Sequence, residues 1–296
     1  LMPNYLTVHE KPEAQIEYLL TAFGGWADAA ESATTTLKYL QRRLQARKFA
    51  EIDPEEFFDF TQTRPYSLRT KEGLRRIQWP ANEFAYSVGS DQTKGIMFFL
   101  GVEPNLRWRT FSRTIAELAQ ECGVKTVVHV GTLLDAVPHT REVSLTGTAT
   151  NPDLRRIMEG SSIRASNYQG PTGISSAVLE ACANLGMGCA SLWGHTAHYL
   201  QAAPNYRVSY TLAEMLNKLL GLSLDLGELS TAARTFDEEV ANAVTRDEQL
   251  SSYVKKLEDQ YDESAAAGEI PDPAEVVKDL ERFLRSERRQ PGDQQF

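Results

Sequence analysis

The sequence predicts an α/β protein of three layers (α/β/α), with a mostly parallel or mixed central sheet, followed by a small helical domain. Apolar runs alternate with segments of helical periodicity over residues 15–220. Some runs, such as GIMFFLG at 95–101, are apolar at every position, which is typical of a strand covered on both faces. After residue 221 only helical spacing remains. These three observations together indicate a sheet between helical layers and a helical C-terminal part.

The elements follow in order from periodicity and from glycine, proline and capping residues. The segment 26–45 has apolar residues at helical spacing, with Asp28 as a candidate N-cap. Asn151 followed by proline begins another helix. Residues 49–60 are expected to form two short extended pieces around Asp53-Pro54, and 74–88 a hairpin. The other expected strands are 15–23, 95–101, 124–131, 141–150 and 187–194, and the other expected helices lie within 107–122, 151–160, 170–186 and 209–220.

Charge divides the chain into parts. Residues 1–221 carry 22 Lys+Arg and 22 Asp+Glu, whereas residues 222–296 carry 9 and 18. The whole net charge of −9 therefore lies in the C-terminal part. We expect a core domain over 1–221, an acidic helical appendage over 222–288 and a disordered tail over 289–296.

Composition argues against several classes of protein. The chain has no basic stripe interleaved with aromatic residues, the pattern that indicates nucleic-acid binding. It also has no apolar run long enough to span a membrane. The N-terminal residues lack the basic-then-apolar order of a signal peptide. The three cysteines, Cys122, Cys182 and Cys189, form no Cys-x-x-Cys pair and are expected to be buried free thiols. A cytoplasmic protein is predicted, with no cofactor and no metal.

Polar motifs follow the predicted strands, at the edge where α/β proteins form sites. FGGWADAAE at 23–31 has the order of a phosphate loop without its glycine spacing, and Asp28 would compete for the helix amides. Tight-turn packing is therefore favoured over anion binding. In GVEPNLRW at 101–108, Glu103 is either a general base or a carboxylate that fixes its loop by pairing with arginine.

Two histidine motifs are open to similar alternatives. In PHTR at 138–141, His139 would be a base and Arg141 an anion clamp, or both would be held by local partners, with Glu103 a candidate for Arg141. In HTAHY, His195 and His198 have the spacing of a zinc pair, but a hydrogen-bonded lip is favoured. GPTG at 170–173 allows close backbone approach before a helix.

The ordered set FGGWADAAE, RPYS, LGVEPNLRW, GTLLDAVPHTR, SNYQGPTGI and SLWGHTAHY resembles the proteasome assembly chaperone family, in its bacterial branch, over residues 15–265. The resemblance implies a sheet domain similar to the phosphorylase/hydrolase-like fold, and no established reaction. Relatives in eukaryotes and archaea act as assembly or binding factors for proteasome subunits. The motif residues carried over as candidate binding residues are Gly24, Trp26, Asp28, Glu103, Trp108, His139, Thr140, Arg141, Tyr168, Gly170, Gly173, His198 and Tyr199. Pro104, Pro138 and Pro171 belong to the same motifs.

The chain departs from the family pattern at Ala27, Glu142 and Ala197, where the family often has asparagine, proline and proline. It also ends in DQQF, without the hydrophobic-Tyr-any tail by which archaeal relatives dock on proteasome rings.

The resulting prediction is a protein-binding or assembly factor that forms a homo-oligomer, with a trimer as the expected form and proteasome subunits or another protein as candidate partners. The alternative is a nucleoside- or anion-binding enzyme that uses Glu103, His139 and Arg141. A third alternative is a scaffold that captures partners through its acidic helical end.

Overall fold

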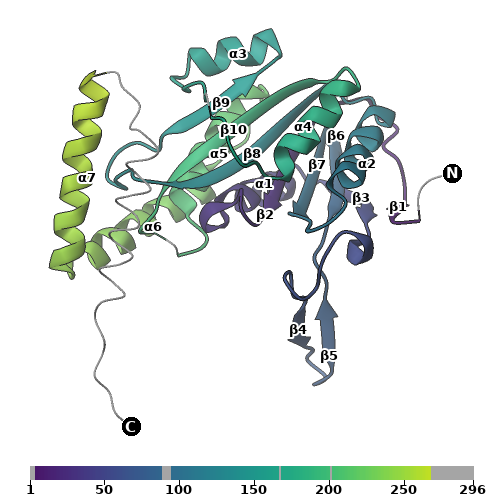
Figure 1. The fold of residues 1–296 in the computed structure, drawn as a ribbon, viewed down its shortest axis with the longest axis horizontal. Helices are drawn as coiled ribbons and strands as arrows, with labels where there is room; N and C mark the ends of the chain where they lie inside the picture. Colours follow the sequence, from purple (N-terminus) through teal and green to yellow (C-terminus); the bar gives the residue numbers. More distant parts are fainter. Residues whose placement is uncertain (1–3, 89–94, 167, 201, 268–296) are drawn as a thin grey trace.

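The computed structural model describes residues 4–88, 95–166, 168–200 and 202–267 (Figure 1). The strands are β1 (Leu6–Val8), β2 (Ile16–Gly24), β3 (Arg47–Ile52), β4 (Tyr66–Arg69), β5 (Arg75–Gln78), β6 (Glu83–Val88), β7 (Gly95–Val102), β8 (Thr126–Asp135), β9 (Leu145–Ala149) and β10 (Gly188–Ala197). The α-helices are α1 (Ser32–Arg43), α2 (Trp108–Glu121), α3 (Pro152–Glu159), α4 (Ile174–Asn184), α5 (Tyr206–Leu219), α6 (Gly227–Thr245) and α7 (Glu248–Ala267).

The main sheet has eight strands in the order β1-β3-β6-β7-β2-β8-β10-β9. Its four central strands, β7, β2, β8 and β10, are parallel, and the outer strands pair antiparallel. The sheet is therefore mixed, as predicted. Because the central strands are parallel, their carboxyl ends meet at one edge, and this edge carries the motifs that follow the strands.

Helices cover both faces of the sheet, which confirms the three-layer architecture (Figure 1). Alternate residues of β2 belong to different apolar clusters: Leu20 and Ala22 pack with α1, α3 and α5, whereas Leu19 and Phe23 pack with α2 and α4. Because helices cover both faces of the sheet, side chains on both sides of such a strand are buried. This explains why these strands are apolar at every position.

The structure corrects three local predictions. The helix expected from residue 26 begins at Ser32, because Ala30 and Glu31 have φ near +50° and break the helical path. Residues 54–56 form a 3₁₀ turn instead of an extended piece, since the Asp53 carboxylate accepts the amide hydrogen of Glu55. The hairpin expected at 74–88 is absent.

The two halves of the hairpin expected at 74–88 belong to different sheets. β5 pairs with β4, while β6 lies between β3 and β7 in the main sheet. Local periodicity identified both strands but not their partners, because strand pairing is decided by contacts distant in sequence. The sequence analysis also missed β1 and β4.

The C-terminal part begins on the body of the protein. Leu226 and Leu229 join the apolar cluster that contains α1 and α5, and α6 packs along α5. Helix α7 follows and lies at the side of the molecule (Figure 1). Residues 268–288 of the expected helical appendage and the tail expected over 289–296 lie outside the described residues. None of the helices within the described ranges has the length and apolar character needed to cross a bilayer.

Candidate functional site

The strand-end motifs form a rim along one edge of the sheet, as the parallel strands require. The rim has two halves with different partners. The first half joins the ends of β2 and β7 to the start of α4. The second half joins the ends of β8 and β10 to helix α7. Each half is defined by contacts of its own side chains.

Glu103 is the centre of the first half. Its backbone amide donates to the Gly24 carbonyl at 2.9 Å, and its carboxylate accepts the amide hydrogen of Ile174 at 2.8 Å, at the start of α4. The Glu103 carboxylate lies so close to Gly173 that a Cβ there would be 3.0 Å from Oε1. Gly25 has φ of +123°, a conformation that side-chain-bearing residues rarely adopt. Glu103 therefore fixes the glycine turns by hydrogen bonding.

Two aromatic side chains cover these turns and remain open to solvent. Trp26 is 62% exposed and lies against Gly173, and Tyr168 is 63% exposed and lies against Gly170. The Tyr168 hydroxyl donates to the Pro171 carbonyl at 3.0 Å. The glycines of GPTG thus make room for aromatic rings of the same chain.

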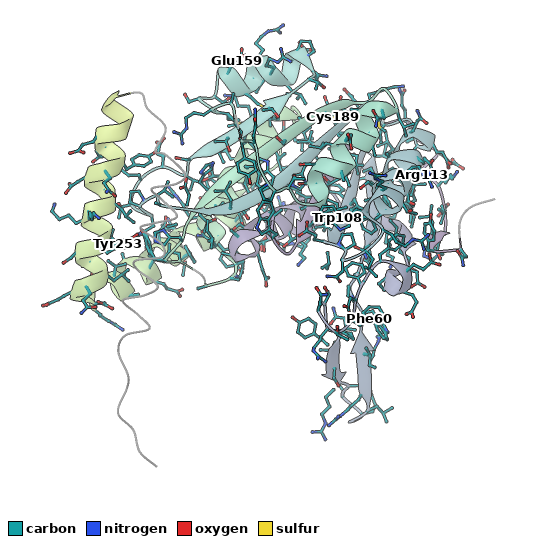
Figure 2. The ribbon with its side chains drawn as sticks, viewed as in Figure 1. Phe60, Trp108, Arg113, Glu159, Cys189 and Tyr253 are labelled. Atoms are coloured by element: carbon teal, nitrogen blue, oxygen red, sulfur yellow. The ribbon has the colours of Figure 1, made fainter. Side chains whose placement is uncertain are left out.

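The loop between β7 and α2 is fixed in a similar way. The Trp108 indole N–H donates to the Pro104 carbonyl at 2.6 Å (Trp108 is labelled in Figure 2), and Arg107 forms an ion pair with Glu56. These contacts give Trp108 a role in shaping the loop.

Asp28 occupies the helix terminus that a phosphate would need. Its carboxylate accepts the amide hydrogens of Ala33 and Thr34 at 2.8 and 3.2 Å and the Thr34 hydroxyl at 2.5 Å. Burial raises the pKa of Asp28, and the hydrogen bonds from Thr34 and Ala33 oppose this change. The N-cap position of α1 belongs to Glu31 and not to Asp28, but the Asp28 carboxylate occupies the helix amides as predicted. The FGGW turn therefore offers no free α1 amides to an anion.

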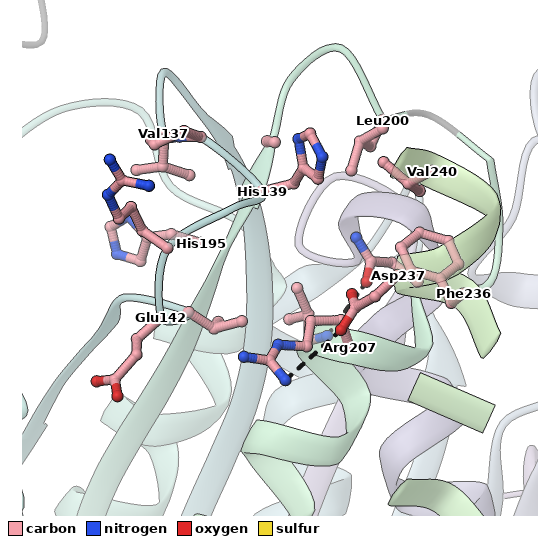
Figure 3. A pocket seen from close by; sticks show the side chains of 15 residues that line it. Val137, His139, Glu142, His195, Leu200, Arg207, Phe236, Asp237 and Val240 are labelled. Carbon is pink, nitrogen blue, oxygen red and sulfur yellow. Dashed lines mark hydrogen bonds and ion pairs between the residues drawn. The ribbon is translucent and has the colours of Figure 1, made fainter. Parts of the chain in front are cut away.

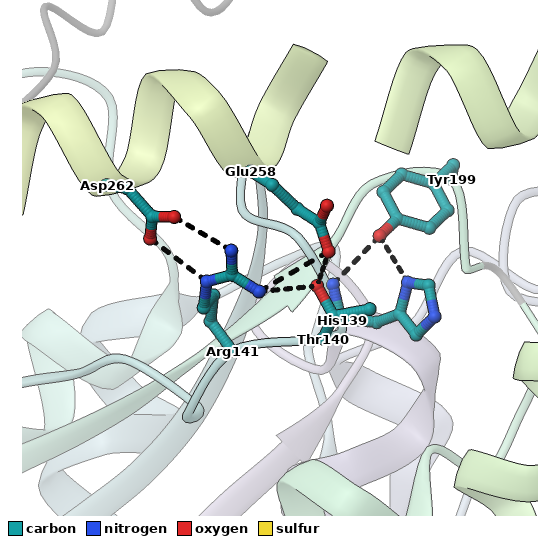
Figure 4. Close-up of polar contacts among 6 residues, drawn as sticks. All are labelled: His139, Thr140, Arg141, Tyr199, Glu258 and Asp262. Carbon is teal, nitrogen blue, oxygen red and sulfur yellow. Dashed lines mark hydrogen bonds and ion pairs between the residues drawn. The ribbon is translucent and has the colours of Figure 1, made fainter. Parts of the chain in front are cut away.

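His139 and Tyr199 begin the second half of the rim (Figure 4). The Tyr199 oxygen lies 2.8 Å from the His139 backbone nitrogen and 2.7 Å from His139 Nδ1. The backbone N–H donates to the hydroxyl. In a neutral imidazole protonated at Nε2, Nδ1 accepts the hydrogen of this hydroxyl. Burial lowers the pKa of His139 and raises that of Tyr199 to about 12, in agreement with the neutral pair.

Thr140 and Arg141 hold helix α7 (Figure 4). The Arg141 guanidinium donates to both carboxylate oxygens of Asp262 at 2.9 and 2.8 Å, and it contacts Glu258 at 3.3 Å. The Thr140 hydroxyl donates to the same Glu258 oxygen. Two parallel N–H···O bonds fix the orientation of both groups, so Arg141 positions α7 as well as attracting its charge.

His198 supplies a further contact to α7. The Asp135 carbonyl accepts from the His198 backbone N–H at 3.0 Å and lies 3.1 Å from Nδ1. Nδ1 is therefore the protonated nitrogen, and Nε2 accepts the hydroxyl of Tyr253 at 2.9 Å. Burial lowers the pKa of His198. Val254 and Leu257 of α7 are 4% and 3% exposed, so an apolar stripe lies beside these polar contacts.

His195 is held away from α7. Its Nδ1 lies 2.6 Å from a carboxylate oxygen of Asp135, and its Nε2 lies 3.0 Å from the Thr146 hydroxyl. Burial alone would raise the pKa of Asp135, but the hydrogen bond and charge of His195 lower it. Both ring nitrogens of His195 and of His198 thus have protein partners. Within the described residues, no group of three or more His, Cys, Asp or Glu side chains is placed to hold a metal ion.

The contacts correct the pairing expected for Arg141, which binds Asp262 and Glu258 of α7 instead of Glu103. Glu103 and Arg141 have partners in different halves of the rim, so no contact joins the residues of the proposed enzyme site. The sequence analysis missed the α7 residues. The sequence feature that could have identified them is the spacing of Glu258 and Asp262. They lie four positions apart, on one side of a helix whose apolar stripe faces the protein.

A small cavity lies beside the second half of the rim (Figure 3). Its volume is about 30 Å³, which suits about one water molecule. Asp237 of α6 lines it with Arg207, at 3.6 Å between the charged atoms, and His139 lies at the opposite side. Burial raises the pKa of Asp237, while the charges of Arg207 and His139 oppose this change. A nucleoside would not fit in this space.

The cysteines are buried free thiols, as predicted. Burial raises the pKa of Cys122 to about 11 and that of Cys182 to about 12, and it also raises that of Cys189. The thiolate is the nucleophilic form of cysteine, and these environments disfavour it.

Comparison with known proteins identifies the family. A family model described as the PAC2 family matches residues 22–244, three quarters of the chain. The chain belongs to the PAC2 family. Among curated proteins, none matches the sequence.

Solved structures of PAC2 proteins agree with this assignment. A Mycobacterium tuberculosis proteasome-assembly chaperone homologue, Rv2125, is 30% identical, with a TM-score of 0.71 over 80% of this chain and 99% of that one. A PAC2 family protein from Streptomyces avermitilis is 34% identical, with a TM-score of 0.70 over 80% and 99% of the two chains. Pyrococcus furiosus PbaB, an archaeal proteasome activator, shares the fold at 19% identity, with a TM-score of 0.64 over 80% and 97%. The predicted resemblance is confirmed.

Acidification is expected to release α7 from the rim of this PAC2 protein. The docked state favours neutral His139 and His198, because burial lowers the pKa of both imidazoles. A released state therefore binds more protons below about pH 6.5, and docking weakens as the pH falls through that value. Asp237 and Glu258 face His139 and oppose the effect. The pKa of Asp262 is lowered by Arg141, so this pair adds a further loss at lower pH.

Hydrogen exchange of α7 amides at pH 7.5 and 5.5, corrected for intrinsic rates, measures this release. Protection of α7 should fall while that of α1 persists. Tyr199→Phe, which leaves Nδ1 of His139 without its donor, should reduce α7 protection already at pH 7.5. Equal corrected protection at both pH values would contradict the expectation.

Proposed function

We propose that this PAC2 protein is a protein-binding assembly factor, a cytoplasmic homo-oligomer with a trimer as its form, and that proteasome subunits are its candidate partners. The observation that carries the proposal is that the second half of the rim binds a polypeptide segment, helix α7, through Thr140, Arg141 and His198. The neighbouring cavity has room for about one water molecule. The second half of the rim is therefore suited to a helix.

The chemistry of the rim indicates what kind of segment it takes. Arg141 donates hydrogen bonds to two carboxylates four residues apart, and His198 Nε2 accepts one from a tyrosine hydroxyl. Between them lies the apolar stripe of Val254 and Leu257. We infer that a partner presents an acidic amphipathic helix with the same order of groups, and that it competes with α7 for this half of the rim.

The relatives support proteasome subunits as partners. Rv2125 is described as a proteasome-assembly chaperone homologue, and PbaB as a proteasome activator. The fold common to these proteins positions the same strand ends at one edge. The assignment of proteasome subunits as partners of the present chain is a proposal based on its relationship to these proteins.

Capture of purified 20S subunits from the source organism tests the function. Truncation after Asp247 removes α7 and leaves α6 on the core, where Leu229 is buried. We expect the truncated chain to capture subunits more tightly than the full chain, because the competitor is gone. Adding Arg141→Ala to the truncation should abolish capture, whereas Arg113→Ala on the exposed surface of α2 should not.

The outcomes separate the alternatives. Loss of capture on truncation would mean that the acidic helix itself binds the partner, as the scaffold alternative predicts. Thermal stabilisation by phosphate or a nucleoside that disappears in Arg141→Ala would instead favour the enzyme. Absence of subunit capture by every variant would overturn the assembly-factor proposal.

A further inference from the structure

A two-stranded arm projects from the body of the protein (Figure 1). β4 and β5 pair antiparallel with each other, from Tyr66 opposite Gln78 to Arg69 opposite Arg75, and they form a sheet of their own. Every residue of both strands is exposed. The arm, defined as residues 64–79, is anchored at its base by the ring of Trp79, which lies 4.6 Å from that of Phe60 (Phe60 is labelled in Figure 2).

The arm is apolar to a degree that is unusual for a solvated hairpin. Five of the nine large hydrophobic side chains that the described structure exposes lie on it: Tyr66, Leu68, Leu74, Ile77 and Trp79. Leu74 is 69% exposed and Tyr66 is 74% exposed. An isolated two-stranded hairpin is marginally stable in water, and clustered exposed apolar residues mark an interaction surface. The arm therefore has the character of a segment that packs on another molecule.

The arm is also strongly basic. It carries five basic residues and one acidic residue, Glu72. The basic residues are Arg64, Arg69, Lys71, Arg75 and Arg76. Within the described part of the chain, none of them takes part in an ion pair. The surface that receives the arm should therefore be acidic.

The same chain supplies an acidic surface where α6 passes into α7. Residues 237–248 contain five acidic residues and one basic residue. Glu238, Glu239 and Glu248 are exposed, and among the described residues they have no ion-pair partner. The arm and this α6–α7 junction lie well apart in Figure 1, so one copy does not bring its own arm to its own junction.

We propose that the arm of one copy docks on the acidic α6–α7 junction of a second copy. The contact joins two different surfaces, so it repeats from copy to copy and closes into a ring when the rotation allows. A rotation of about 120° between neighbouring copies closes the ring as a trimer, whereas a twofold exchange of arms would close it as a dimer. This inference rests on the self-association included in the proposed function and assigns its contact surfaces.

Size-exclusion chromatography with light scattering at micromolar concentration tests the proposal. The wild-type chain should elute as an oligomer, and Arg75→Glu with Arg76→Glu should elute near the 33.1 kDa of one chain. Arg109→Glu with Arg113→Glu makes the same change of charge on exposed positions of α2 and should remain oligomeric. Adding Glu238→Arg and Glu239→Arg to the arm variant should restore the oligomer. Because charges drive the contact, high salt should lower the wild-type mass.

Several results would overturn the proposal. A wild-type chain that is monomeric, or an arm variant of unchanged mass, excludes the contact. Loss of mass that the charge swap does not restore excludes the junction as the receiving surface. An arm variant of unchanged mass that no longer binds RNA or anionic vesicles would show that the arm serves a different partner. Capture of 20S subunits by the truncated chain is measured separately, so the assembly-factor proposal stands or fails independently of these results.

Discussion

Replacing Phe111 with alanine is expected to lower the free energy of unfolding by about 3–5 kcal/mol. Phe111 projects from α2 into the sheet and is fully buried. Its ring lies 5.2 Å from that of Phe57, 5.9 Å from that of Phe99 and 6.4 Å from that of Phe23. Alanine would leave a cavity among closely packed rings, two of which, Phe23 and Phe99, are held by strands β2 and β7 of the sheet. Urea denaturation of both proteins measures the loss.

Phe111→Leu is the matched variant, because leucine keeps most of the apolar volume. Its loss of stability should be clearly smaller than that of the alanine variant. Equal losses for the two variants would show that ring geometry and not volume decides stability at this position. A loss below about 1 kcal/mol for alanine would contradict the packing described for this cluster.

Replacing Asp28 with alanine is expected to cost about 2–3 kcal/mol of stability. The change removes the acceptor of the Ala33 and Thr34 amide hydrogens and of the Thr34 hydroxyl, and all three groups lie in a buried region. Unpaired buried donors are more costly than the simple loss of a surface cap. Asp28 also stands where β8 meets the FGGW turn, through its bridge to Thr132.

Asp28→Asn is the control for this prediction. An asparagine side-chain oxygen can accept both amide hydrogens, and its amide group can donate to Thr34. Thermal and urea denaturation should therefore rank the wild type and asparagine variant together, well above alanine. A wild-type-like alanine variant would mean that water replaces the carboxylate at the start of α1.

The two proposed roles of the C-terminal helices, docking on the rim of the same copy and binding the arm of a second copy, are compatible. Glu258 and Asp262 bind the rim of their own copy, whereas Glu238, Glu239 and Glu248 remain exposed for a second copy. A partner that displaces α7 from Arg141 would therefore also move one end of the proposed contact between copies.

Much of the candidate site could be predicted from local sequence. Strand ends were recognised from apolar runs that stop at glycine and polar residues, and the placement of Gly24, Glu103, Asp135 and Ala197 at one edge follows from parallel pairing. That the Asp28 carboxylate occupies the amides at the helix start was also predictable, since the groups are only five and six positions apart, although the N-cap position itself belongs to Glu31. Both kinds of information are contained in short segments.

The sequence by itself determined the layered α/β class, the family and the side chains that the rim contains, because periodicity, capping and motif order are local properties of the chain. The tertiary structure decided which of those side chains meet. It separated Glu103 from Arg141, brought Asp262 to Arg141 across 121 positions and left the 64–79 arm without a covering element. The physical reason is that contacts between distant residues depend on strand order and helix placement, which the whole core fixes together and no short segment encodes.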